Sequence, residues 1–212
     1  MKKRRGLTKK ERRNKKKLQL KNKKLVKKYY WLVPRNVWSG KILDNYDYTW
    51  IDWGCSPGWE KAYGKMYMEE LGAEIKRIKQ KNFMILQEKE KFGQHRLYTT
   101  GTSEKAQEII DKYEIISEHI CYFCGRPDTP MTDAGWILPV CPKCYEKKWR
   151  RNSKYEYDEI ASDSDIRIPD TYKITRFSKN GNEIIEHNIK DTADTIRIWW
   201  NKNHPDDQVE VR

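Results

Sequence analysis

The sequence predicts a small α+β protein with a four-cysteine zinc ribbon, a basic N-terminal tail and a C-terminal β-hairpin followed by a short helix. Four of the five cysteines form two C-x-x-C pairs, apolar residues recur at helical spacing in two segments, and an Asn-Gly pair separates two strand-like runs. The chain of 212 residues is 37% hydrophobic and has a mean hydropathy of −1.04, so any core is modest. The longest strictly apolar run falls far short of the roughly 18 residues that cross a bilayer, and no apolar segment follows the basic N-terminus. We therefore expect neither a membrane-spanning nor a secreted protein.

Changes in composition divide the chain into five expected segments. These are a basic tail over 1–28, an aromatic-rich α+β domain over 29–120, the zinc ribbon over 121–150, a polar linker over 151–170 and a C-terminal hairpin module over 171–212. The tail holds 16 of the 44 basic residues and one of the 31 acidic ones, and positions 29–212 carry a net charge of −2. All of the excess positive charge therefore lies in the tail.

Such dense like charge cannot bury a core, so the tail is expected to be disordered or helical until it meets a polyanion. Three roles are open: contact with nucleic-acid phosphates, docking on anionic lipid, or a solubilising tail. A membrane-binding helix needs a broad apolar face with Trp or Phe, which the tail lacks. We favour nucleic acid, DNA or RNA, and the candidate binding residues are Lys2, Lys3, Arg4, Arg5, Lys9, Lys10, Arg12, Arg13, Lys15, Lys16, Lys17, Lys21, Lys23, Lys24, Lys27 and Lys28.

The stretch 29–59 holds five of the nine tryptophans among several Gly and Pro residues, which predicts loops and short strands. Its rings are expected to pack a small irregular core, and stacking of exposed rings on bases is the alternative. Ser56 and Pro57 then start a helix whose apolar residues recur to Ile78, with Gly72 as a possible end of a first helix.

A hairpin and a second helix follow. Residues 83–87 and 94–99 read as strands joined by a turn at 91–93. Ser103 can cap a helix that reaches Glu118, and its apolar stripe is expected to pack on the hairpin. The stripe consists of Ala106, Ile109, Ile110, Tyr113 and Ile116.

The two cysteine pairs are Cys121 with Cys124 and Cys141 with Cys144, separated by sixteen residues. Two such turns let four thiolates converge in a tetrahedron, which predicts one structural Zn²⁺. Disulfides and a redox pair are the alternatives, and neither fits two facing pairs in a chain without secretory features. Four thiolates leave no open coordination position, so the metal is not expected to be catalytic. His119 is expected to be no ligand, and Cys55 to be a small buried hydrophobe.

At the C-terminal end, residues 172–177 and 183–189 flank Asn180-Gly181, the pair that a type I′ turn needs. Asp191 or Thr192 can cap a last helix that ends before Pro205.

A nuclease is a weaker alternative. The segment 125–140 lacks the histidine that zinc-stapled His-metal endonucleases carry there. A strand site could use carboxylates and a lysine from Gln87, Glu88, Lys89 and Glu90, but alternating Glu and Lys residues usually form a solvated face.

The ordered series of motifs resembles an uncharacterised family of phage and mobile-element proteins from Gram-positive hosts. The motifs are YWLVPRN from Tyr30, DYT from Asp47, PGWEKAYG from Pro57, KEKFGQHRLY from Lys89 after Glu88, the helix over 109–117, C-x-x-C-G-R-P from Cys121 and G-W-I-x-P-x-C-x-x-C from Gly135. The resemblance covers about 30–147 and implies a phage or prophage origin and expression in the bacterial host cytoplasm. The family supplies no established activity.

We therefore expect a phage-encoded, non-enzymatic zinc-ribbon protein that binds nucleic acid through its tail. Zinc ribbons also serve as docking surfaces, so the first alternative is a phage protein that docks on a host complex such as polymerase, ribosome or a defence system. A metal-dependent nuclease is the second alternative.

Overall fold

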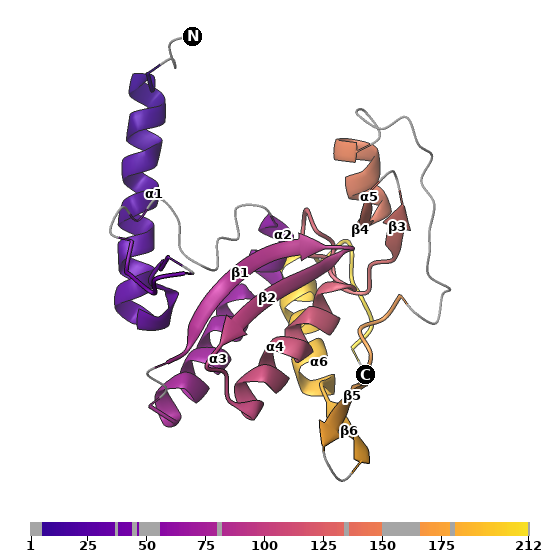
Figure 1. Cartoon of the computed structure of the whole chain (residues 1–212). Helices are drawn as coiled ribbons and strands as arrows, with labels where there is room; N and C mark the ends of the chain where they lie inside the picture. Colours follow the sequence, from indigo (N-terminus) through magenta and orange to yellow (C-terminus); the bar gives the residue numbers. More distant parts are fainter. Residues whose placement is uncertain are drawn as a thin grey trace.

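The computed structural model describes residues 6–36, 38–43, 46, 56–79, 82–133, 136–149, 166–178 and 181–211. Within these ranges, helices combine with three antiparallel sheets of two strands each (Figure 1). The α+β class is therefore as predicted. None of the described helices is long and apolar enough to cross a membrane.

The tail forms a helix, α1 (Lys9–Lys28), which is the helical one of its two predicted states. Thr8 caps it in a capping box: its hydroxyl accepts from the backbone N–H of Glu11, whose carboxylate accepts in return from the N–H of Thr8. The end nearer Lys28 contacts the body, with Leu25 and Val26 packed against the core. The N-terminal half stands clear of the rest of the described chain in Figure 1.

The central body follows the predicted order of helix, hairpin and helix. Its first helix begins at Pro57 behind the cap Ser56 and runs through α2 (Pro57–Trp59), a π-helical segment η3 (Glu60–Gly64) and α3 (Lys65–Arg77). The hairpin is β1 (Met84–Lys91) with β2 (Gln94–Thr100), and α4 (Glu104–Ser117) begins behind the cap Ser103.

Gly72 does not end the first helix, contrary to the expectation. It lies inside α3, where a Cβ would meet Trp31 Nε1 at 3.2 Å and the ring of Tyr29 at 3.3 Å. The glycine therefore makes room for the rings of Tyr29 and Trp31. Tyr29 directly precedes the short 3₁₀ helix η1 (Tyr30–Leu32), and Trp31 lies within it.

The main core lies between α3, α4 and the hairpin. All five residues of the predicted α4 stripe are buried, and α4 contacts both β2 and α3. Three tyrosines stack inside it, with the Tyr113 ring centroid 5.4 Å from that of Tyr63 and 4.4 Å from that of Tyr67. The stripe prediction is confirmed.

The aromatic stretch divides between core and surface. Tyr29, Trp31 and Trp59 are buried as expected, whereas Tyr30 and Trp38 are exposed. Trp50, Trp53 and Cys55 lie outside the described residues.

The C-terminal elements are β5 (Thr171–Ser178), β6 (Gly181–Asn188) and α6 (Lys190–Asn203). Ser178 pairs with Gly181, so the glycine is a strand residue and the turn falls at 179–180, outside the described residues. The N-cap is Ile189, two residues before Asp191 and three before Thr192, and it makes no side-chain cap hydrogen bond. The helix ends before Pro205, as expected. Buried residues of this segment join the main core: Ile168, Tyr172, Ile189, Ala193 and Ile196.

Candidate metal centre

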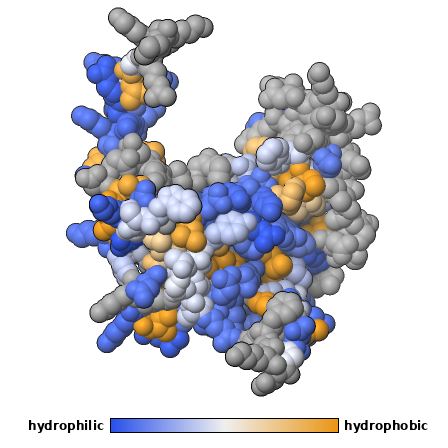
Figure 2. Space-filling model, viewed as in Figure 1, coloured by the Kyte–Doolittle hydropathy of each residue, from blue (hydrophilic) through white to orange (hydrophobic). Residues whose placement is uncertain are grey.

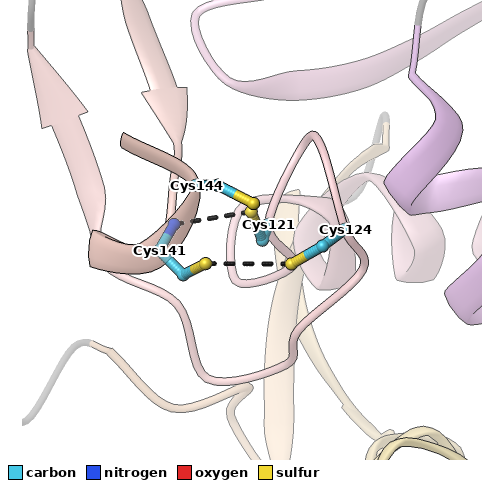
Figure 3. Close-up of side chains that lie close together, drawn as sticks. All are labelled: Cys121, Cys124, Cys141 and Cys144. Carbon is cyan, nitrogen blue, oxygen red and sulfur yellow. Dashed lines mark hydrogen bonds between the residues drawn. The ribbon is translucent and has the colours of Figure 1, made fainter. Parts of the chain in front are cut away.

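The four predicted cysteines converge in one cluster (Figure 3). Cys121 and Cys124 lie in the loop after α4. Cys141 directly precedes the short helix α5 (Pro142–Cys144), and Cys144 is its last residue. Strands β3 (Met131–Asp133) and β4 (Ile137–Pro139) pair antiparallel and bring the second pair back to the first. All four Sγ atoms lie within 4.8 Å of one another.

The sulfur positions fit a tetrahedral metal site. The Sγ atoms of Cys124 and Cys141 are 3.7 Å apart. A tetrahedron with metal–sulfur bonds of about 2.3 Å has edges of about 3.8 Å. A disulfide bond needs about 2.05 Å, and all four cysteines are free thiols. The four cysteines could therefore bind one metal ion, with no coordination position left open.

Backbone hydrogen bonds shape both cysteine turns. Gly125 N–H donates to the carbonyl of Cys121 at 2.9 Å, and Cys144 N–H donates to that of Cys141 at 2.9 Å. Gly125 has φ +89°, a conformation that glycine adopts without steric cost. Cys141 N–H also points to the sulfur of Cys121 at 3.4 Å. The thiol positions are thus set by the backbone.

The four thiols shift one another's pKa values. Hydrogen bonds from Cys124, Cys141 and Cys144 lower the pKa of the Cys121 thiol, against the opposing effect of burial. Hydrogen bonding to Cys121 raises the pKa of Cys124 and of Cys141. Because a metal binds thiolates, ion binding at this cluster has to release the remaining protons.

The first cysteine turn lies directly against the start of α2. Gly58 N–H donates to the carbonyl of Tyr122 at 3.0 Å, and the indole of Trp59 donates to the carbonyl of Ile120 at 3.0 Å. A Cβ on Gly58 would lie 2.1 Å from the carbonyl oxygen of Cys121. The sequence patterns do not predict this contact, although a glycine in the first turn of a helix is a usable signal.

A buried ion pair joins the other side of the ribbon to α6. Arg197 is 1% exposed and binds Asp128 with two hydrogen bonds, Nε to Oδ2 at 2.9 Å and an Nη to Oδ1 at 3.0 Å. The guanidinium also donates to Asp194 at 2.8 Å and to the carbonyl of Ile168 at 3.1 Å. The ribbon is therefore held between the start of α2 and α6.

The predicted nucleic-acid-binding residues occupy one exposed helix. The twelve from Lys9 to Lys28 lie on α1 and are all exposed. Two of them form exposed ion pairs, Lys21 with Glu60 at 3.1 Å and Lys28 with Glu69 at 3.4 Å. Lys2, Lys3, Arg4 and Arg5 lie outside the described residues.

His119 is outside the cysteine cluster, as expected. Its Nδ1 lies 3.3 Å from the carbonyl oxygen of Ile166. Among the residues that the structure describes, no other group of histidine, cysteine or carboxylate side chains converges in this way.

The expected solvated face on β1 is wrong for Glu88. Its side chain is 8% exposed and lies 3.0 Å from Nε2 of His95, which is 3% exposed. The pair packs beside Trp59, whose ring centroid is 5.6 Å from that of His95. Glu90 instead accepts from Gly93 N–H and from the indole of Trp136. The carboxylates of Glu88 and Glu90 thus each make a different structural contact.

Comparison of the chain with protein-family models, with curated proteins and with solved structures finds no match. The phage-family resemblance drawn from the motifs therefore stays a prediction.

Proposed function

We propose that this protein binds nucleic acid without catalysing a reaction, through the basic face of α1, and that its four cysteines hold one structural Zn²⁺. The observation that carries the first part is a helix with twelve exposed cations and a single acid, Glu11, attached to the body near one end.

The distribution of charge around α1 supports contact with phosphates. Lys9, Arg13, Lys16, Lys23 and Lys27 recur at helical spacing and share one face. Leu25 and Val26, which pack against the core, lie on the other side. Among the described residues, Lys23 Nζ lies 5.3 Å from the ring centroid of Tyr46. All five cations are nevertheless exposed while the helix is held in place.

The length of α1 suits a nucleic-acid backbone. Its 20 residues span about 30 Å. A duplex presents one phosphate charge per about 1.7 Å, so a helix of this length passes more phosphates than it has cations. Six to eight contacts would give a slope of log K against log salt of about −5 to −7.

The chemistry of the donor set supports Zn²⁺. Four thiolates in a tetrahedron are the usual ligands of structural zinc, and the coordination shell is then complete. The ion would hold the ribbon's loops together and contribute to folding rather than to a reaction. Metal analysis of freshly purified, reduced protein should find one Zn²⁺ per chain, and protein that is folded without zinc would refute this part.

The test of nucleic-acid binding compares two triple variants of the full chain. The first is Lys9→Gln with Arg13→Gln and Lys16→Gln, which keeps helix-forming residues on the face. The control is Lys65→Gln with Lys76→Gln and Lys202→Gln, three exposed cations outside α1.

Binding of a labelled duplex is then titrated at several salt concentrations. The α1 variant should bind more weakly and lose about 2.7 from the slope, since each phosphate contact contributes about 0.9. The control should keep the parental slope. Equal effects of the two variants, or affinity that does not respond to salt, would contradict the role of α1 and favour protein docking.

A further inference from the structure

A cleft opens where the tip of the β1–β2 hairpin meets the β3–β4 strands. Its volume is about 520 Å³, within the roughly 300–1,000 Å³ typical of ligand sites. Figure 2 shows hydrophobic surface at this junction. The lining residues are two lysines, two carboxylates and three apolar or aromatic residues: Lys89, Lys91, Glu90, Asp133, Phe92, Trp136 and Ile137.

Two large rings are held at the cleft with much of their surface in solvent. Phe92 is 67% exposed and Trp136 is 60% exposed. Phe92 has φ +52°, a left-handed backbone conformation that Asn, Asp or Gly adopts more easily. The chain thus keeps an aromatic ring at a position where folding alone favours a small polar residue. Strain of this kind clusters at binding sites.

A hydrogen-bonded carboxylate holds the indole of Trp136 and the turn that carries Phe92. Glu90 Oε1 accepts from the N–H of Gly93 at 2.8 Å, which closes the turn that carries Phe92. Its Oε2 accepts from the indole N–H of Trp136 at 2.9 Å. Gly93 also lies against Met131 of β3, where a Cβ would come within 2.6 Å of two side-chain atoms. The walls of the cleft are therefore preorganised.

Cations lie beside these rings. Lys91 Nζ is 5.5 Å from the ring centroid of Phe92, and Lys89 Nζ is 5.0 Å from that of Tyr98 on the neighbouring strand. Both lysines line the cleft, as does Glu90 between them in β1. A flat ring stacked in the cleft would have an attached anionic group within reach of these long side chains.

We propose that the cleft binds one unpaired base of single-stranded nucleic acid, stacked against Phe92 and Trp136, with the adjoining phosphates held by Lys89 and Lys91. Aromatic platforms beside cations are the common means of holding single strands. A base inside a duplex is stacked and cannot enter such a cleft. The inference deepens the proposed function and rests on it, because α1 supplies the general attraction and the cleft the preference for unpaired strands.

The experiment measures binding of the full chain to a labelled twelve-nucleotide oligothymidine and to a twelve-base-pair duplex. Trp136→Ala and Phe92→Asn each remove one ring, and Asn suits the left-handed backbone at position 92. Each variant should weaken single-strand binding about 5- to 150-fold, the usual effect of losing one stacked base. Duplex affinity and the salt slope should stay unchanged.

Trp38→Ala is the matched control, because Trp38 is 94% exposed and does not line the cleft. It should leave both affinities unchanged. Unchanged single-strand binding in both cleft variants would overturn the proposal, and so would an equal loss for duplex and single strand. A cleft variant that binds nucleic acid normally but loses a co-purifying protein would also overturn it and assign the surface to protein docking.

The two proposals fail in different ways. If the α1 triple variant loses its salt slope while the cleft variants bind normally, only the base-binding cleft is wrong. If the α1 variant binds normally while the cleft variants lose single-strand affinity, the cleft stands and the role of α1 is wrong.

Discussion

Replacing Gly58 by alanine tests the contact between the first cysteine turn and the start of α2. The new Cβ would lie 2.1 Å from the carbonyl oxygen of Cys121, 2.7 Å from that of Tyr122 and 2.8 Å from the nitrogen of Gly125. These atoms belong to the backbone, so no side chain can rotate away. An ordinary contact needs about 3.5 Å, and the helix and the turn must therefore separate by roughly 1 Å or more.

Separation weakens two hydrogen bonds that cross the contact. They are the 3.0 Å bond from Gly58 N–H to Tyr122 and the 3.0 Å bond from the Trp59 indole to Ile120. Each buried group left without its partner costs about 1–3 kcal/mol, and overpacking costs about 1–3 kcal/mol. Alanine returns up to about 1 kcal/mol of helix propensity. Because the two bonds are weakened rather than lost, we expect a net loss in the lower part of the range that these costs span, about 2–5 kcal/mol in the free energy of unfolding.

Urea unfolding of the metal-loaded protein, followed by tryptophan fluorescence, measures this loss, and a chromophoric chelator measures metal release in parallel. Gly58→Ala should unfold at lower urea and release metal faster. Gly6→Ala is the control, since a Cβ there meets nothing within 4 Å. If the two variants differ by less than about 0.5 kcal/mol, the reasoning is refuted.

Three further variants probe other parts of the same structure. Cys144→Ser leaves three thiolates, so elemental analysis should show metal content falling well below one ion per chain, together with lost protection of ribbon amides in hydrogen exchange; full metal loading would exclude Cys144 as a ligand. Arg197→Met leaves Asp128 buried without its ion pair and should lower the free energy of unfolding by about 3–5 kcal/mol in urea titrations, whereas a change below 1 kcal/mol would place little weight on the pair. Ile109→Ala empties a core position that is 4% exposed and should cost about 2–5 kcal/mol in the same assay, and a cost near zero would mean that Ile109 contributes little to the core.

Local patterns were enough to predict the elements that local interactions specify. The cap Ser103 and the α4 stripe depend on residues within one helix, and the cysteine spacing brings the thiols together through two short turns. For the tail, composition alone leaves a disordered and a helical state open. The structure has the helix, which the Thr8 capping box and the packing of Leu25 and Val26 on the core together favour.

Contacts between distant segments could not be predicted in this way. Arg197 and Asp128 are 69 residues apart, and no local pattern in the sequence links the two positions. The alternating charges around Glu88 predict a solvated side chain, yet α4 and the ring of Trp59 cover the site of its contact with His95. A helix end at Gly72 is a reasonable local prediction, but the rings that need its space lie about forty residues earlier in the chain.

The position of the ribbon between the start of α2 and α6 has a consequence for folding kinetics. Its contacts reach back 61 residues to Trp59 and forward 69 residues to Arg197, so each closes a long loop before it gains any stabilisation. Long-range closures of this kind slow folding. If a metal ion folds the ribbon early, the surfaces that contact Trp59 and Arg197 are already formed when these long loops close. The refolding rate should then depend on whether metal is present at the start or is added afterwards.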